Sequence, residues 1–103
     1  MRVISKKKLR EYYEKNTQSE KPLTEWYYKM KNATANNLNE LRKTFHAGAD
    51  SVNGYTVFNI GGNHYWLITA MHYKHQRCYI RVIWTHAEYS RKLNQEKLKQ
   101  GGL

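Results

Sequence analysis

A histidine, a tyrosine and an arginine near the end of the chain are the residues best suited to chemistry. His86 and Tyr89 are three residues apart, so one turn of helix would place them on the same face. Histidine, with an ordinary pKa of about 6.5, is a natural proton donor and acceptor, and tyrosine can donate a hydrogen bond or orient a substrate. Arg81 precedes them and could stabilise an anionic group. A simpler interpretation of His86 is that it caps or hydrogen-bonds a strand–helix junction.

Residues 77–85 alternate between two kinds of side chain, which is typical of a strand with one buried face. The set expected to pack against helices is Cys78, Ile80, Val82 and Trp84. The opposite set is Arg77, Tyr79, Arg81, Ile83 and Thr85. On the preceding strand, His64 and Trp66 are expected on the side of Arg81. The sequence therefore predicts a sheet face that carries cations, imidazoles and aromatic rings.

Carboxylates are scarce in this half of the chain, because Glu88 is the only acidic residue between Tyr55 and Tyr89. Two-metal nucleases and glycosidases need clustered carboxylates, so neither chemistry is expected. RNA supplies its own nucleophile, the 2′-hydroxyl, once a protein group takes the proton from that hydroxyl. A cation must then stabilise the pentavalent phosphate, and an acid must protonate the leaving 5′ oxygen. We therefore interpret the polar face as a surface that binds and cleaves RNA without metal or cofactor.

Residues around the turn at 74–76 have alternative roles. Lys74 and Arg77 could steer RNA towards the face, where aromatic rings could stack on its bases. His72 and His75 flank the turn and could suggest a metal site. No carboxylate is close in sequence, and the nearby thiol of Cys78 is expected on the buried face of the strand, so a solvated turn is the favoured interpretation of these two histidines.

The elements that must hold these residues follow from hydrophobic periodicity and turn signals. Helices are expected over 6–15, from Pro22 onward with Leu23, Trp26, Tyr27 and Met30 facing the core, and over 38–43. Strands are expected over 2–5, 54–60, 64–73 and 77–85, with a loop at 46–54 and a tight turn at 61–63. Residues 88–100 read as a charged helix with few apolar residues, frayed or ordered only on a partner. The fold class is α+β: a small antiparallel sheet, made of an N-terminal strand plus a three-stranded meander, flanked by N-terminal helices and a C-terminal helix.

Composition limits the partners. The chain has 103 residues, enough for one domain, and its 18 Lys and Arg against 8 Asp and Glu give a net charge of +10. Such an excess favours a polyanionic partner, nucleic acid first. The lysine run at 6–8 is either a solvated helix turn or a contact to phosphates or an acidic partner. A single cysteine, Cys78, with no apolar membrane span and no signal peptide, predicts a soluble cytoplasmic protein with a buried thiol.

Four motifs resemble the HigB family of toxins, part of the wider RelE-like group of bacterial toxin–antitoxin systems. They are PLTEWY at Pro22–Tyr27, FNIGGN at Phe58–Asn63, YIR at Tyr79–Arg81 and THAEY at Thr85–Tyr89. The resemblance extends to about Tyr89 and implies a single RelE-like toxin domain over 1–103, with 90–103 as a basic C-terminal helix or tail. The implied activity is that of an mRNA interferase, an endoribonuclease that cuts messages on the ribosome and so inhibits translation.

The resemblance also implies partners: a HigA-like helix-turn-helix antitoxin, mRNA and the ribosome, operator DNA only through the antitoxin complex, and no membrane. By position, Arg81 matches the arginine of YIR, and His86 and Tyr89 match the TH-x-EY motif. The residues expected in catalysis are Arg81, His86, Tyr89, Lys74 and His64. The residues expected to bind RNA are Trp66, Arg77, Tyr79, Arg91 and Lys92.

The chain departs from the family pattern at three positions. Trp66 stands where relatives have an arginine, His64 where they have a lysine, and Ser90 where they commonly have an aspartate. Losing the arginine removes a charge-assisted phosphate contact, which is roughly twice as strong as a neutral one. The chain is then either an attenuated enzyme, or one in which Trp66 stacks a base while neighbouring cations supply the charge.

Two other functions fit the basic composition. The first is a binding module that uses the same face to hold RNA or an acidic partner without cleaving it. The second is a small DNA-binding protein, which needs a recognition helix. The only strongly basic helix expected is the apolar-poor tail, so DNA binding is disfavoured.

Overall fold

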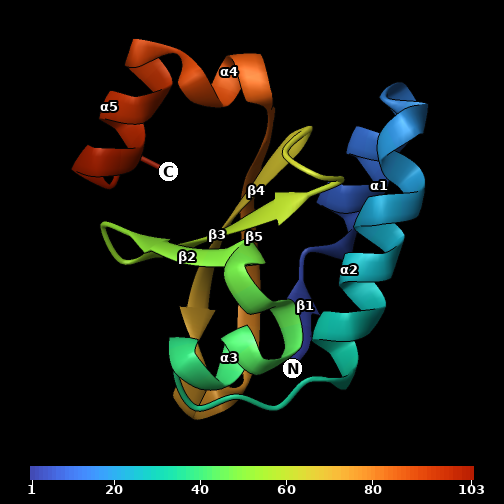
Figure 1. Ribbon diagram of the computed structural model, residues 1–103, viewed down its shortest axis with the longest axis vertical. Coiled ribbons are helices and arrows are strands. Elements are labelled where there is room, and N and C mark those ends of the chain that lie inside the picture. Colours follow the sequence, from blue (N-terminus) through green and yellow to red (C-terminus); the bar gives the residue numbers. More distant parts are fainter.

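A five-stranded sheet runs through the computed structural model, which describes residues 1–103 (Figure 1). Its strands are β1 (Arg2–Ile4), β2 (Ala49–Val52), β3 (Tyr55–Ile60), β4 (Tyr65–His72) and β5 (Arg77–Thr85). The strand order is β1-β5-β4-β3-β2; β1 is parallel to β5, and all other neighbours are antiparallel. The predicted α+β class is therefore confirmed, with the N-terminal strand joining as a parallel strand.

The fifth strand, β2, lies where a loop was expected over 46–54. It pairs with β3 through a tight turn at Asn53 and Gly54, which have φ of 49° and 83°. Positive φ at both central residues is the geometry of the hairpin turn that an Asn-Gly pair favours. The expectation of a loop was wrong here because this turn signal follows a run with too few apolar residues to indicate a strand.

Five α-helices accompany the sheet: α1 (Lys6–Lys15), α2 (Glu20–Asn32), α3 (Leu38–Phe45), α4 (His86–Ser90) and α5 (Lys92–Gln100). The bounds predicted for α1 are confirmed, and α2 carries Pro22 in its first turn, where a missing N–H is tolerated. At the start of α3, the Asn37 side chain accepts a hydrogen bond from Glu40 N at 2.9 Å. Helices α1 and α2 run together on one side of the sheet, and α4 and α5 lie on the other (Figure 1).

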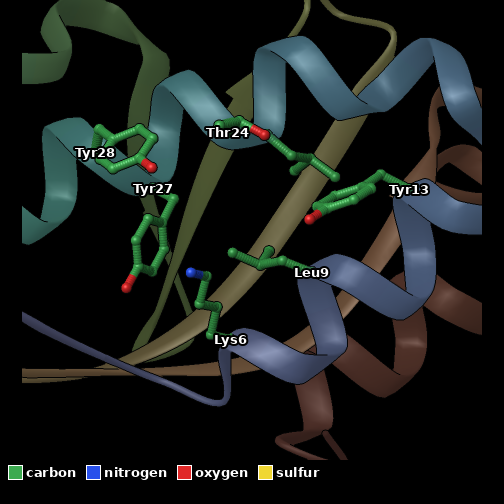
Figure 2. A pocket seen from close by; sticks show the side chains of 7 residues that line it. Lys6, Leu9, Tyr13, Thr24, Tyr27 and Tyr28 are labelled. Atoms are coloured by element: carbon green, nitrogen blue, oxygen red, sulfur yellow. The ribbon is translucent and has the colours of Figure 1, made fainter.

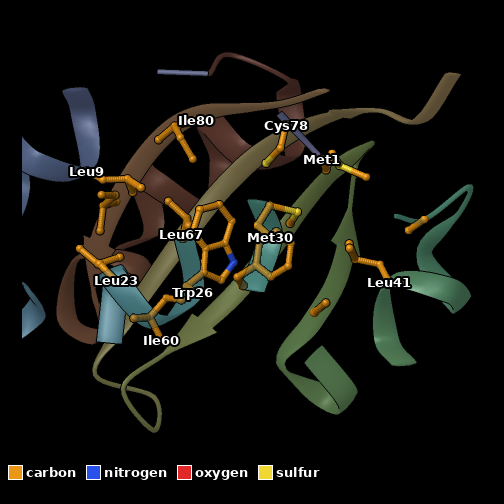
Figure 3. Packing of buried hydrophobic residues seen from close by; sticks show 14 residues of the cluster. Met1, Leu9, Leu23, Trp26, Met30, Leu41, Ile60, Leu67, Cys78 and Ile80 are labelled. Atoms are coloured by element: carbon orange, nitrogen blue, oxygen red, sulfur yellow. The ribbon is translucent and has the colours of Figure 1, made fainter. Parts of the chain in front are cut away.

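The main core lies between the sheet and helices α1 to α3. Leu23 and Met30 of α2 and Leu67 of β4 are fully buried there, as the apolar spacing of α2 predicted (Figure 3). An aromatic group joins them: the Trp26 ring lies 5.2 Å from that of Phe58, and Phe45 lies 5.0 Å from Phe58. Edge-on contacts of this kind add to the area burial that holds α2 and α3 on the sheet.

A β-bulge at Arg81 reverses the predicted faces of the end of β5. Ile68 of β4 pairs with Val82, and the next residue, Thr69, pairs with Ile80, so Arg81 has no partner. One extra residue switches every later side chain to the other face. Consequently Ile83 packs in the main core, whereas Val82 and Trp84 lie on the opposite face, the reverse of the expectation.

The opposite face of the sheet is not an open polar surface. A second cluster of buried residues covers part of it: Tyr55, Val57, Ile68, Trp84 and Leu98. Leu98 belongs to α5 and is fully buried, so the C-terminal helix docks on the sheet through it. The expectation of a frayed tail was wrong, because one leucine at the right position provides the apolar contact that composition alone did not reveal.

Cys78 on β5 is fully buried, and burial raises the pKa of its thiol from an ordinary 9.0 to about 12. The folded protein therefore keeps this proton while the unfolded chain loses it. We expect stability to be full below pH 9 and to fall as the pH rises towards 12, by roughly 4 kcal/mol at most. The free energy of unfolding, measured with urea at pH 8 and pH 11, should fall less between the two pH values in Cys78→Ala than in wild type. An equal fall in both proteins would contradict this expectation. A thiol reagent at pH 8 should label Cys78 only after unfolding.

Candidate functional site

A capping box builds the junction between β5 and α4. The Thr85 side chain accepts a hydrogen bond from Glu88 N at 3.2 Å, and Thr85 N donates to Glu88 Oε1 at 2.9 Å. This reciprocal pair sets the direction in which α4 leaves the sheet. Thr85, not His86, caps the helix, which leaves the exposed His86 without a capping role. The Thr-x-x-Glu spacing is a sequence signature of this box, and with it the capping role of His86 could have been excluded.

Several predicted site residues gather at this end of the sheet. The N–H of His86 donates to the carbonyl O of His64 at 3.1 Å, and both residues are exposed. Arg91, which separates α4 from α5, and Lys92, which begins α5, are also exposed and follow Tyr89 closely in sequence. The hydrogen bond explains how a residue before β4 and a residue after β5 come together.

Tyr89 and Trp66 form a stacked pair. Their ring centroids lie 4.7 Å apart with planes 25° from parallel, and Trp84, which faces Trp66 across β4 and β5, lies 6.4 Å from Tyr89. The Trp66 indole N–H is buried without a hydrogen-bond partner. The Gln95 side chain donates to the carbonyl of Tyr89 and so ties α5 to this turn. Trp66 thus packs against Tyr89, and its expected role in RNA binding stays a prediction.

Lys74, Arg77 and Tyr79 lie towards the far end of β5. At about 3.3 Å per residue, Arg77 and Thr85 are roughly 25 Å apart along the strand. Lys74 precedes Arg77 in the turn of residues 73–75. The predicted catalytic set is therefore not brought together as a whole, because Lys74 cannot contact the phosphate that His86 would contact. The length of the predicted strand over 77–85 already implied this separation.

Arg81 occupies an intermediate place, on the open edge of β5. Strand β1 pairs with β5 only as far as Tyr79, so the edge beyond it has no strand neighbour. Arg81 is exposed there, and its guanidinium carbon lies 5.9 Å from the centroid of the Tyr79 ring. From Arg81 to His86 the strand rises roughly 15 Å. Both side chains can therefore contact one short stretch of an extended RNA.

Tyr12 of α1 is a further polar group near this site, and it was not among the residues predicted for the site. Its hydroxyl is buried without a hydrogen-bond partner, and its ring meets that of Tyr65 edge-on at 6.0 Å. Burial, followed by the negative charge of Glu88 and by Tyr65, raises the pKa of Tyr12 to about 12. The phenol therefore keeps its proton at neutral pH and can only act as a hydrogen-bond donor or acceptor. No spacing in the sequence links α1 to β5, so this placement had no sequence signal.

The three lysines that begin α1 have three different surroundings. Lys6 lies 4.7 Å from the centre of the Tyr27 ring, Lys7 pairs with Glu11 at 3.7 Å, and Lys8 donates to the carbonyl O of Ile80 at 3.3 Å. Lys6 helps line a hollow between α1 and α2 that contains none of the predicted site residues (Figure 2). Of the three, only Lys8 approaches β5.

No group of three or more His, Cys, Asp and Glu side chains could hold a metal ion. None of the helices is both long and apolar enough to cross a membrane. The candidate site presents an exposed histidine, a stacked tyrosine and an exposed arginine on a free strand edge.

The fold defines an α+β protein whose basic and aromatic residues line the last strand and the helix after it. Residues 19–92 match the HigB toxin family, described as the RelE-like toxic component of a toxin–antitoxin system, and the chain belongs to this family. No curated protein matches the chain significantly. A toxic component of this kind has an antitoxin as its partner, and RelE-like toxins generally act as endoribonucleases.

Proposed function

We propose that this toxin is an mRNA interferase that cleaves messages on the ribosome, needs no metal ion, and is neutralised by a helix-turn-helix antitoxin of the HigA type. One observation carries the proposal: the capped β5–α4 junction presents His86 and Tyr89 just beyond the strand edge that presents Arg81. These three residues match the family motifs by position. They also provide the proton transfer and the charge stabilisation that RNA cleavage by its own 2′-hydroxyl requires.

Each residue has a role in this chemistry. The 2′-oxygen attacks phosphorus as its proton leaves, and the bond from phosphorus to the 5′ oxygen breaks as that oxygen gains a proton. His86 exchanges the protons, Arg81 stabilises the charge that develops on the phosphate oxygens, and Tyr89 orients the nucleotide against its ring. His64, next to His86, is a second proton carrier. Lys74 and Arg77 lie too far away for catalysis and hold the flanking message.

The test measures cleavage by purified toxin in two settings. Ribosomes carrying a defined message should yield cuts within the A-site codon, mapped by primer extension. Free single-stranded RNA at high toxin concentration should be cut equally well in EDTA and in Mg²⁺, since no protein-bound metal takes part. Cleavage that disappears in EDTA would contradict the metal-free chemistry, and intact message on ribosomes would contradict the proposed activity.

A second candidate function is a binding module that holds RNA without cleaving it. The observation that favours it is Trp66, which occupies the family arginine position and is stacked on Tyr89. We expect Trp66→Arg to place a cation beneath Tyr89 and to raise the cleavage rate of an attenuated enzyme about tenfold or more, because charge-assisted contacts to phosphate are the stronger ones. Single-turnover cleavage measures this, with Trp66→Phe as the control that keeps an aromatic ring. A measurable rate that Trp66→Arg leaves unchanged means that the native site already has its full charge, whereas RNA binding without cleavage by either protein favours the binding module.

A further inference from the structure

A groove runs between α1 and the open edge of β5, outside the junction of His86 and Tyr89. It has a volume of about 280 Å³. Its walls are Lys8, Glu11, Tyr12, Lys15 and Asn16 from α1 and its end, and Ile80, Arg81, Val82 and Ile83 from β5. Arg81 is thus shared between this groove and the proposed catalytic site.

The α1 wall carries two lysines at a regular spacing. Lys8 and Lys15 are seven residues apart, which is two helical turns, so they project from the same face about 10 Å apart along the axis. Both are exposed, and neither takes part in an ion pair. Glu11 is the only carboxylate in the walls, and Lys7, outside the groove, pairs with it at 3.7 Å. Lys8, Lys15 and Arg81 therefore line this groove without an ion-pair partner.

The strand wall is unsuited to a protein strand. An open edge normally invites pairing with another strand, and both a bulge and a lysine are features that prevent it. Here the bulge at Arg81 interrupts the edge, and Lys8 Nζ already donates to the carbonyl O of Ile80 at 3.3 Å. A lysine ammonium has three donors, so two remain for another acceptor. These features favour an anionic ligand that needs cations over a peptide that needs a regular backbone ladder.

We propose that this groove binds the phosphodiester backbone of single-stranded RNA, with Lys8 and Lys15 on one wall contacting phosphates that flank the one held by Arg81. The inference rests on the proposed function and adds to it: α1 determines the path of the message on the side away from His86. Lys8 and Lys15 are positioning residues, because they hold the strand while Arg81 touches the reacting phosphate.

The experiment measures equilibrium binding of a short fluorescent RNA with 2′-O-methyl riboses, which cannot be cleaved. Each phosphate contact with single-stranded nucleic acid contributes about 0.7 to the slope of log affinity against log salt. We expect Lys8→Gln/Lys15→Gln to reduce the slope by about 1.4 and to weaken binding roughly 25-fold at 0.1 M salt. Lys8→Arg/Lys15→Arg should bind like wild type. Lys21→Gln/Lys43→Gln, which removes the same charge from α2 and α3, should change the slope by less than half as much.

Three outcomes would overturn the inference. The first is an unchanged salt slope in the folded Lys8→Gln/Lys15→Gln protein, and the second is an equal fall in slope in the Lys21→Gln/Lys43→Gln control. The third is a Lys8→Gln/Lys15→Gln protein that no longer binds a polyglutamate peptide but still binds RNA, which would assign the groove to an acidic protein. Because Lys8 also bonds to the strand, circular dichroism and Lys15→Gln alone, expected at about half the slope change, separate binding from folding. Binding to uncleavable RNA does not depend on catalysis. If the toxin cleaves messages but Lys8→Gln/Lys15→Gln leaves the salt slope unchanged, only the proposed groove is contradicted. If the slope falls as expected but the toxin cleaves no message, only the proposed activity is contradicted.

Discussion

Arg81→Ala is expected to lower message cleavage by about 10²–10³-fold and to relieve growth inhibition while the protein stays folded. The size follows from removing one preorganised donor that stabilises charge in the transition state. Arg81 is exposed and sits in a bulge without a partner on β4, so its loss leaves no cavity and no broken ladder. The measurement is single-turnover cleavage of ribosome-bound message, with circular dichroism and thermal unfolding to verify the fold.

Two companion variants make the result specific. Arg81→Lys keeps the charge but loses the planar fork that contacts two phosphate oxygens, so its rate should fall between those of wild type and Arg81→Ala. Arg10→Ala is the matched control: Arg10 is exposed on α1 and pairs only with Glu14 at 3.8 Å. Its cleavage rate should equal that of wild type. If folded Arg81→Ala cleaves as fast as Arg10→Ala, Arg81 does not stabilise the phosphate.

Leu98→Ala is expected to lower the free energy of unfolding by about 2–5 kcal/mol, the usual cost of emptying a fully buried leucine site. Leu98 is the residue of α5 that enters the second cluster, where it packs with Tyr55, Ile68 and Trp84. Hydrogen bonds also hold α5 and the residues after it. Tyr55 Oη donates to the carbonyl O of Leu103 at 2.9 Å, and Asn53 Nδ2 donates to the carbonyl O of Leu98 at 3.3 Å. Urea unfolding followed by tryptophan fluorescence gives the free energy.

Leu93→Ala is the matched control for Leu98→Ala, since it makes the same change in the same helix. Leu93 is 63% exposed, so its truncation should cost less than about 0.5 kcal/mol. Hydrogen exchange of residues 92–100 then distinguishes a local release of α5 from global unfolding, because release raises exchange in this helix alone. Equal effects of the two substitutions would show that α5 does not dock through Leu98. Because Gln95 of α5 binds the turn of Tyr89, release of α5 should also slow cleavage.

The docked helix and Trp66 together set the surroundings of Tyr89. Tyr89 is held from two sides, by Trp66 beneath its ring and by the Gln95 side chain at its carbonyl. An arginine at position 66 would supply charge at this place, whereas Trp66 supplies a flat apolar support. If the proposed function holds, the positive charge at the site comes from Arg81 and from the lysines of α1 that line the proposed groove.

Local patterns in the sequence determined the fold class, the family and most helices and strands. The bounds of α1 and β5 followed from apolar spacing and alternation, and the motifs from Phe58 to Tyr89 indicated the HigB family. Hairpin and capping signals at Asn53-Gly54 and Thr85-x-x-Glu88 were also in the sequence, and the structure has them at the turn between β2 and β3 and at the start of α4, although the first of them did not lead to a prediction of β2. These features are local, because they depend on dihedral preferences and hydrogen bonds within a few residues.

Only the tertiary structure decided which of these residues meet. The bulge at Arg81 depends on the register between β4 and β5, and one unpaired residue reversed the faces of Val82, Ile83 and Trp84. The approach of Lys8 to Ile80 likewise depends on how distant segments pack. Strand alternation is a property of one strand and contains no information on its partner. The arginine, histidine and tyrosine were therefore visible as a chemical set in the sequence, whereas their positions relative to one another came from the packing of α1, β5 and α4.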